Sequence, residues 1–236
     1  MTNKKRIVTL TGAGISAESG IKTFRDADGL WEGHDVMEVA TPEGFNRNPQ
    51  LVLKFYNERR NQLKEVQPNK AHYELASLEE EFNVTVITQN VDDLHERAGS
   101  SHIIHLHGEL TKASSSGDPS YVKTWHGAIS SSDICPKGFQ MRPYIVWFGE
   151  AVPMLESAIK EIANCDAIII IGTSMQVYPA ASLTSYAPLD VPIYYVDPNP
   201  TINYELSQSN RLKIFKGPAT IETSNAIQAL KDLYSI

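Results

Sequence analysis

The sequence has little cysteine, little basic charge and no long hydrophobic run. Cys135 and Cys165 are its only cysteines, too few for a disulfide framework or a four-thiolate zinc site. The formal net charge of -7 is opposite in sign to that of most nucleic-acid-binding proteins. No apolar stretch is long enough to span a bilayer, and the N-terminus carries no signal-peptide core. We expect a cytoplasmic protein with reduced thiols, no nucleic-acid partner and no membrane contact.

Strand-like and helix-like segments alternate along the chain, which is typical of an α/β fold. The run Ala167–Ile171 is apolar throughout, as in a central parallel strand that is covered on both faces. Between Thr111 and Gly138 the sequence is rich in turn residues, and we expect this segment to leave the sheet. The prediction is a Rossmann-like parallel sheet with helices on both faces plus a smaller inserted domain. The large domain would comprise residues 1-30, 83-110 and 143-236, and the small domain a helical insertion, 31-82, with the excursion 111-142.

A glycine turn follows the first apolar strand. Gly12 and Gly14 can adopt positive φ angles and let a ligand approach the backbone closely. Ser16 can cap the helix that begins there, whose free N–H groups favour an anion. This pattern predicts a phosphate-binding turn, although a strand-to-helix turn without a ligand is built from the same residues.

A second helix is predicted to begin at Asn48, which suits its cap, with proline in its first turn. Five of its side chains recur at spacings of three and four residues and form one stripe. They are Val52, Tyr56, Arg59, Leu63 and Val66. Arg59 is the exception on this stripe, because a buried guanidinium is costly without a partner. It either forms an internal ion pair, reaches solvent, or lines with Tyr56 a pocket for an anionic ligand group.

Polar side chains follow the predicted strand Val84–Ile87. They belong to the stretch 88–95, which contains Gln89, Asn90 and Asp92. Ligands of open α/β sheets bind at the carboxyl ends of strands, so this stretch is a candidate site. A helix cap would explain Asn90 or Asp92 singly, but not the whole set.

Three later strands also end in polar residues. His105 and His107 alternate along one strand and therefore share a face; we expect one to be structural and His107, at the strand end, to be a candidate general base. The turn 172–174 is a second phosphate-sized turn. Asp197 follows another strand, where an acidic residue can accept hydrogen bonds from ribose hydroxyls.

Taken together, these motifs resemble those of the sirtuins, which are NAD-dependent protein-lysine deacylases. The resemblance extends from about residue 7 to the C-terminus. Its motifs are Gly12-Ala13-Gly14-Ile15-Ser16, Gly20-Ile21-Lys22-Thr23-Phe24-Arg25, Thr88-Gln89-Asn90-Val91-Asp92, His107-Gly108 and Gly172-Thr173-Ser174. It implies NAD as cosubstrate and acylated-lysine proteins as partners. Tyr56 and Arg59 further resemble the class III branch, in its bacterial type, which favours succinyl and malonyl groups.

The resemblance also implies a role for each matching residue. The pyrophosphate and riboses of NAD would lie against Gly12, Ala13, Gly14, Ser16, Arg25, Gln89, Gly172, Thr173 and Ser174. The nicotinamide carboxamide would bind Asn90, Val91 and Asp92, with Phe24 over the reacting ribose and Asp197, Pro198, Asn199 and Ala219 at the adenosine end. His107 would be the general base that activates a ribose hydroxyl, and Asn90 and Asp92 complete the catalytic set. The substrate backbone would pair as an added strand with Val146, Phe148, Gly149 and Glu150, while Tyr56 and Arg59 bind the acyl carboxylate.

The sequence departs from the sirtuin pattern in three places. Lys22 stands where many members have proline, and Asp197 where many have asparagine. Most sirtuins carry two C-x-x-C pairs after the catalytic histidine, whereas Cys135 is alone in that region, so we expect no zinc.

Other functions would use the same NAD site. An ADP-ribosyltransferase or a deacylase for other acyl chains shares the whole pattern. A non-catalytic sensor of NAD or ADP-ribose is a third alternative, but His107 together with Asn90 and Asp92 argues against it, because binding alone requires no general base. The motifs imply no particular oligomeric state.

Overall fold

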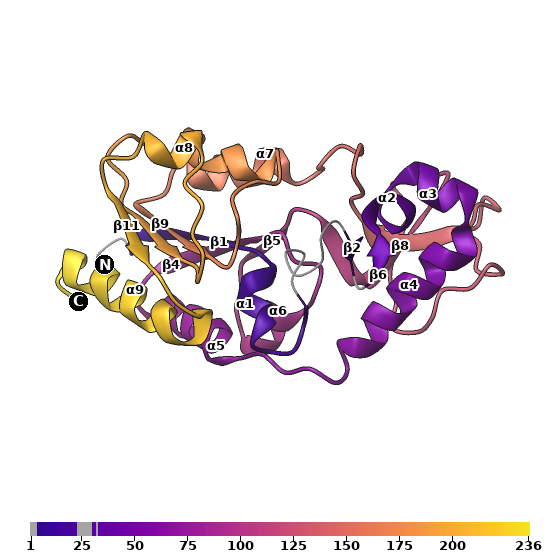
Figure 1. Ribbon diagram of the computed structural model, residues 1–236, viewed down its shortest axis with the longest axis horizontal. Helices are drawn as coiled ribbons and strands as arrows, with labels where there is room; N and C mark the ends of the chain where they lie inside the picture. Colours follow the sequence, from indigo (N-terminus) through magenta and orange to yellow (C-terminus); the bar gives the residue numbers. More distant parts are fainter. Residues whose placement is uncertain (1–3, 23–29, 32) are drawn as a thin grey trace.

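A computed structural model describes residues 4–22, 30–31 and 33–236 (Figure 1). Its main feature is a six-stranded sheet in the order β11-β10-β9-β1-β4-β5, with all neighbouring strands parallel. The strands are β1 (Arg6–Thr11), β4 (Asn83–Thr88), β5 (Ile103–His105), β9 (Ala167–Ile171), β10 (Ile193–Val196) and β11 (Leu212–Phe215). All five residues of β9 are buried, because this strand lies between β1 and β10 and is covered on both faces. The predicted Rossmann-like parallel sheet is confirmed.

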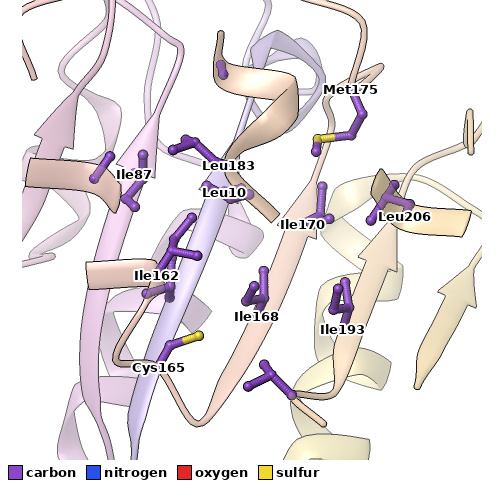
Figure 2. Packing of buried hydrophobic residues seen from close by; sticks show 14 of the residues in the cluster. Leu10, Ile87, Ile162, Cys165, Ile168, Ile170, Met175, Leu183, Ile193 and Leu206 are labelled. Carbon is purple, nitrogen blue, oxygen red and sulfur yellow. The ribbon is translucent and has the colours of Figure 1, made fainter. Parts of the chain in front are cut away.

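Helices cover both faces of this sheet. Figure 1 shows α5 (Lys70–Ser77) and α9 (Ala219–Tyr234) on one face, and α7 (Leu155–Ile162) and α8 (Tyr204–Ser207) on the other. A separate apolar cluster fills each layer. Figure 2 shows the second layer, where Ile168 and Ile170 of β9 lie beside Leu10 of β1. The 3-10 helix η3 (Ala180–Tyr186) also packs in this layer.

The rest of the chain forms a second unit with its own apolar core. We call the described residues between 30 and 63, together with residues 108–147, the small module. Its helices are α2 (Val36–Val39), α3 (Pro42–Arg47) and α4 (Pro49–Gln62), beside the short hairpin of β2 (Leu30–Trp31) and β3 (His34–Asp35). Its three-stranded antiparallel sheet contains β6 (Gly108–Ser115), β7 (Val122–Thr124) and β8 (Met141–Ile145) in the order β7-β6-β8.

The excursion is more regular than its sequence indicates. Strand β6 runs to Ser115, into the segment whose sequence is rich in turn residues. A register shift between Glu109 and Ala113 breaks the alternation of β6, which hides the strand from a pattern of period two. The expected domain boundaries at 110/111 and 142/143 fall inside β6 and β8.

Helix ends also differ from the predictions. Helix α4 begins as expected, with the Asn48 side chain accepting from Leu51 N, but it ends at Gln62, so Leu63 and Val66 are buried beyond the helix proper. No helix in the described ranges combines the length and the apolar character needed to cross a membrane.

Candidate active site

The two phosphate-sized turns pack directly against each other. Gly14 N donates to Gly172 O at 2.8 Å, and a Cβ atom on Gly14 would lie 2.6 Å from Gly172 Cα. A Cβ atom on Gly12 would lie 2.7 Å from Thr173 Cβ. Gly12 has a φ of -129°, and Gly14 also lies outside the positive region, whereas Gly172 has a φ of +62°. Neither Gly12 nor Gly14 uses the positive φ that glycine permits: close packing of the turns, not a left-handed backbone, requires these glycines.

Ser16 is not a helix cap. It is fully buried inside α1 (Ala13–Ala17), whose N-cap position is Gly12. Its hydroxyl donates to Asp92 Oδ2 at 3.0 Å and accepts from Asn90 Nδ2 at 3.1 Å. The hydroxyl therefore joins α1 to the polar stretch after β4, because both of its partners lie there.

Asn90 and Asp92 are buried at the carboxyl end of β4. Asn90 Nδ2 also donates to Gly12 O at 3.1 Å. Asp92 Oδ1 accepts from the N–H of Leu94, the first residue of α6 (Leu94–Ala98), at 3.1 Å, and Oδ2 accepts from Ser16, so both carboxylate oxygens have a partner although Asp93 is the N-cap of the helix. Burial raises the pKa of Asp92 to about 6, although the hydrogen bonds from Leu94 and Ser16 oppose the shift. A costly buried carboxylate in a polar cluster is a mark of a functional site.

Gln89 connects the same stretch to the second turn. Its Nε2 donates to Thr173 Oγ1 at 2.9 Å, and this bond joins the segments that follow β4 and β9 at the carboxyl ends of the strands. Thr173 is buried and Ser174 is half-buried beside it. Val91, between Asn90 and Asp92, packs against the core of the small module.

His107 lies in the turn between β5 and β6, half-buried. Its Nδ1 is 3.1 Å from Gln89 O, and since a carbonyl oxygen only accepts, Nδ1 carries the proton. Burial lowers the pKa of His107, and the hydrogen bond to Gln89 only partly opposes this effect. The ring is therefore neutral near pH 7 with an Nε2 lone pair that can accept a proton.

The adenosine-end candidates lie at the same edge of the sheet. Asp197 follows β10 and is 3% exposed; its Oδ1 accepts from Asn199 N at 2.8 Å across Pro198. Ala219 is the buried first residue of α9, which follows β11. The parallel sheet thus brings the ends of β1, β4, β9 and β10 together, as the polar strand ends predict.

Tyr56 and Arg59 lie one turn apart on α4. Tyr56 is fully buried and its hydroxyl accepts from Trp147 Nε1 at 3.0 Å, so its own proton remains available to donate. Burial raises the pKa of Tyr56, which keeps the phenol protonated. The Arg59 guanidinium carbon lies 4.2 Å from the centroid of the Phe55 ring, and Nη2 lies 3.9 Å from the Glu58 carboxylate. The structure therefore places a phenol and a guanidinium on one helix of the small module.

The expected substrate strand follows β8. Val146 N donates to His107 O at 2.9 Å, and Phe148 N to Ala40 O at 2.9 Å. Phe148 is 45% exposed and Gly149 has a φ of +89°. The Glu150 carboxylate accepts from both terminal nitrogens of Arg142, at 2.6 and 3.1 Å, and from Trp147 N at 2.8 Å. Glu150 thus stabilises the turn that carries the other three residues. Phe24 and Arg25 lie outside the described residues.

A family model described as "Sir2 family" matches residues 12–179, more than half of the chain. The chain belongs to the Sir2 family. It is 62% identical over 194 residues to an NAD-dependent protein deacylase of Helicobacter pylori, covering 82% of this chain and 85% of that protein. A second such deacylase, from strain J99, is 54% identical over 231 residues, with coverage of 97% and 94%.

Solved structures show the same relationship for this Sir2-family chain. A Sir2 homolog in complex with NAD has a TM-score of 0.83 at 38% identity, with coverage of 98% and 91%. A Sir2 protein bound to a myristoylated histone peptide has a TM-score of 0.72 at 32% identity, with coverage of 98% and 93%. These proteins share the whole fold, including the edge of the sheet at which the polar residues gather.

The residues around Cys135 do not fit the zinc site that the usual sirtuin pattern of two C-x-x-C pairs would form. The Cys135 sulfur accepts a hydrogen bond from Ser115 Oγ at 3.3 Å, and nearby Asp118 is paired with Lys137 at 2.7 Å. Zinc in a structural site requires four ligands, mostly thiolate or imidazole. Within the described parts of the chain, the one group of three or more possible ligand side chains, Glu96, His105 and Glu109, does not include Cys135.

Proposed function

We propose that this NAD-dependent protein deacylase removes acetyl, succinyl and malonyl groups from lysine side chains, with a preference for the acidic acyl groups of the class III branch. The products would be nicotinamide, O-acyl-ADP-ribose and free lysine. The single observation that carries the acyl preference is the pair of Tyr56 and Arg59 on α4, because a phenol and a guanidinium are both donors that suit a carboxylate.

The NAD site would occupy the carboxyl edge of the large sheet. We assign the phosphates and riboses to the turns at 12–16 and 172–174 with Gln89, and the adenosine end to residues 197–199 with Ala219. Asn90, Val91 and Asp92 would bind the nicotinamide end. The buried network of Ser16, Asn90 and Asp92 supports this assignment, since its polar groups are already held in place before a ligand binds. Phe24 and Arg25 remain candidates on the strength of the resemblance.

His107 would act as the general base. NAD supplies two parts of the reaction: the ribose carbon to which the acyl oxygen bonds, and nicotinamide, which leaves from that carbon. The Gln89 carbonyl holds His107 as the Nδ1–H tautomer, so Nε2 would accept the proton of a ribose hydroxyl as that hydroxyl becomes a nucleophile. A neutral imidazole can do this near pH 7, and its lowered pKa supports the role.

The small module would supply the acyl and peptide contacts. Residues 146–150 would contact the substrate backbone through atoms other than the amide nitrogens of Val146 and Phe148, which donate within the protein. Trp147 would hold the Tyr56 hydroxyl in place. We propose that the module is free of zinc and that the hydrogen bond from Ser115 to Cys135 helps to stabilise this region instead. We also propose the two-domain division, in which β6 and β8 cross the junction.

A panel of acyl-lysine peptides tests this function. Acetyl, succinyl, malonyl and myristoyl versions of one peptide would be incubated with and without NAD and followed by mass. We expect NAD-dependent loss of all but the myristoyl group, fastest for succinyl or malonyl peptides. A myristoyl or acetyl peptide that is turned over more efficiently than both acidic peptides would contradict the proposed preference.

A further inference from the structure

Hydrogen bonds to successive backbone carbonyl groups hold the loop that carries Asn90. Four successive carbonyl groups, those of residues 88 to 91, each accept a hydrogen bond from the segment 105–110. Thr88 O accepts from Leu106 N at 2.9 Å and Gln89 O from His107 Nδ1 at 3.1 Å. Asn90 O accepts from His105 Nδ1 at 3.2 Å and Val91 O from Leu110 N at 2.8 Å. Two of the four donors are thus imidazoles, and only one of these is the proposed base.

His105 has both ring nitrogens engaged. Nδ1 faces Asn90 O, and Nε2 lies 2.6 Å from Glu96 Oε1 on α6. Since both partners accept, both nitrogens donate and the ring is an imidazolium. Burial alone would lower the pKa of His105, but the hydrogen bond and charge of Glu96, the charge of Glu109 and the hydrogen bond to Asn90 together raise it.

We infer that His105 is a positioning residue, which holds the Asn90 carbonyl through its Nδ1–H while Glu96 anchors its ring. The inference rests on the proposed function in one respect, that residues 90–92 bind the nicotinamide end of NAD. The Asn90 side-chain amide donates to Gly12 O and Ser16 Oγ, and the His105 bond holds the backbone carbonyl of that same residue. The positive charge of the His105 ring also lowers the pKa of Asp92, which lies two residues after Asn90, and so partly offsets the effect of burial.

A purely structural histidine would act differently. If His105 only filled space, its loss would weaken the fold and every ligand alike. A positioning role for the nicotinamide end predicts a selective loss, because ADP-ribose has no nicotinamide and needs no contact with residues 90–92. The comparison of NAD with ADP-ribose therefore separates the two roles.

The test uses the full chain with three variants and a control. His105→Leu removes both ring donors, His105→Asn keeps an N–H near the Nδ1 position, and Glu96→Ala frees the ring from a side chain that is 41% exposed. His102→Leu is the matched control, since His102 is exposed and precedes the same strand. Each variant is measured for kcat/KM toward NAD with the acyl peptide that the wild type turns over fastest, for affinity toward ADP-ribose by calorimetry, and for thermal unfolding.

We expect His105→Leu to lower kcat/KM for NAD by roughly 10- to 100-fold, because misplacement of a binding group by about 1 Å costs this much. ADP-ribose affinity should not change, and His105→Asn should recover most of the loss. Glu96→Ala should cause a smaller loss of the same kind, which tests the inference even if His105→Leu does not fold.

Three results would overturn the inference: wild-type kcat/KM in the folded His105→Leu and Glu96→Ala variants, a parallel loss of ADP-ribose affinity, or no recovery in His105→Asn. If the proposed acyl preference is wrong, the wild-type peptide panel will show it, and the kcat/KM of each variant relative to wild type will be unaffected.

Discussion

The large sheet and the small module are stabilised in different ways. The centre of the sheet is apolar, and all five residues of β9 are buried. The small module combines a core that contains several aromatic rings with one buried and one half-buried arginine. Arg60 donates to Leu110 O and to Asn57 Oδ1, both at 2.8 Å, and the Arg142 guanidinium lies 3.3 Å from the Trp147 ring centroid.

This difference separates the two parts of the proposed chemistry. The residues assigned to NAD and to proton transfer follow strand ends of the parallel sheet, where hydrogen bonds between strand-end segments hold them. The residues assigned to the acyl chain lie on one helix whose position depends on side-chain contacts. We therefore expect changes at the sheet edge to affect all substrates, and changes on α4 to affect some of them.

The largest expected effect is that of His107→Ala. Loss of the proton acceptor should lower turnover by about 10²- to 10⁴-fold for every acyl peptide, because the step that it serves is common to all. NAD affinity, measured by calorimetry, should be largely retained. Full activity in His107→Ala would show that the general base is another residue.

The second comparison concerns stability. Ile170→Ala in the fully buried β9 should lower the free energy of unfolding in urea by about 2 to 5 kcal/mol. Arg60→Met keeps much of the volume but removes the donor to Leu110 O, and should cost about 1 to 3 kcal/mol. Hydrogen exchange should place the Arg60→Met effect in β6 and α4 and spread the Ile170→Ala effect over the sheet. A uniform increase in exchange for both variants would argue against two separately stabilised regions.

We expect the buried Asp92 carboxylate to lower the free energy of unfolding at neutral pH, where it is ionised. Its pKa rises from 3.8 in the unfolded chain to about 6 when folded, so its favourable contribution is complete below pH 3.8 and is lost as the pH rises through 6. Asp92→Asn removes this loss but also one acceptor, and should raise the free energy of unfolding at pH 7.5 by about 1 to 2 kcal/mol while activity falls. Urea titrations at pH 4 and pH 7.5 check this; a variant less stable than wild type at both values would contradict it.

The sequence predicted the sheet better than the small module, for a physical reason. An apolar run such as 167–171 and a polar strand end are local patterns, so both β9 and the position of the polar residues 89–92 after β4 could be predicted from the sequence. The glycine geometry was missed because it depends on contact between two turns far apart in the chain, at Gly14 and Gly172.

Arg60 was missed for a related reason. Arg59 and Arg60 lie three and four residues after Tyr56, so helical spacing fits both equally, and only the position of β6 determines which one is buried. The second histidine contact, from His105 to Asn90 O, likewise depends on the turn after β5.

The most direct test of this division of labour measures two variants on two substrates. Arg59→Met keeps much of the stem volume and removes the charge; His107→Ala removes the base. On matched succinyl and acetyl peptides, we expect Arg59→Met to lower kcat/KM for the succinyl peptide by roughly 10- to 100-fold, the value of a hydrogen bond to a charged group of about 1.5 to 3 kcal/mol. The acetyl peptide should change little with Arg59→Met, whereas His107→Ala should lower both in parallel. A parallel loss of both substrates in Arg59→Met would contradict the account and make Arg59 a structural residue of α4.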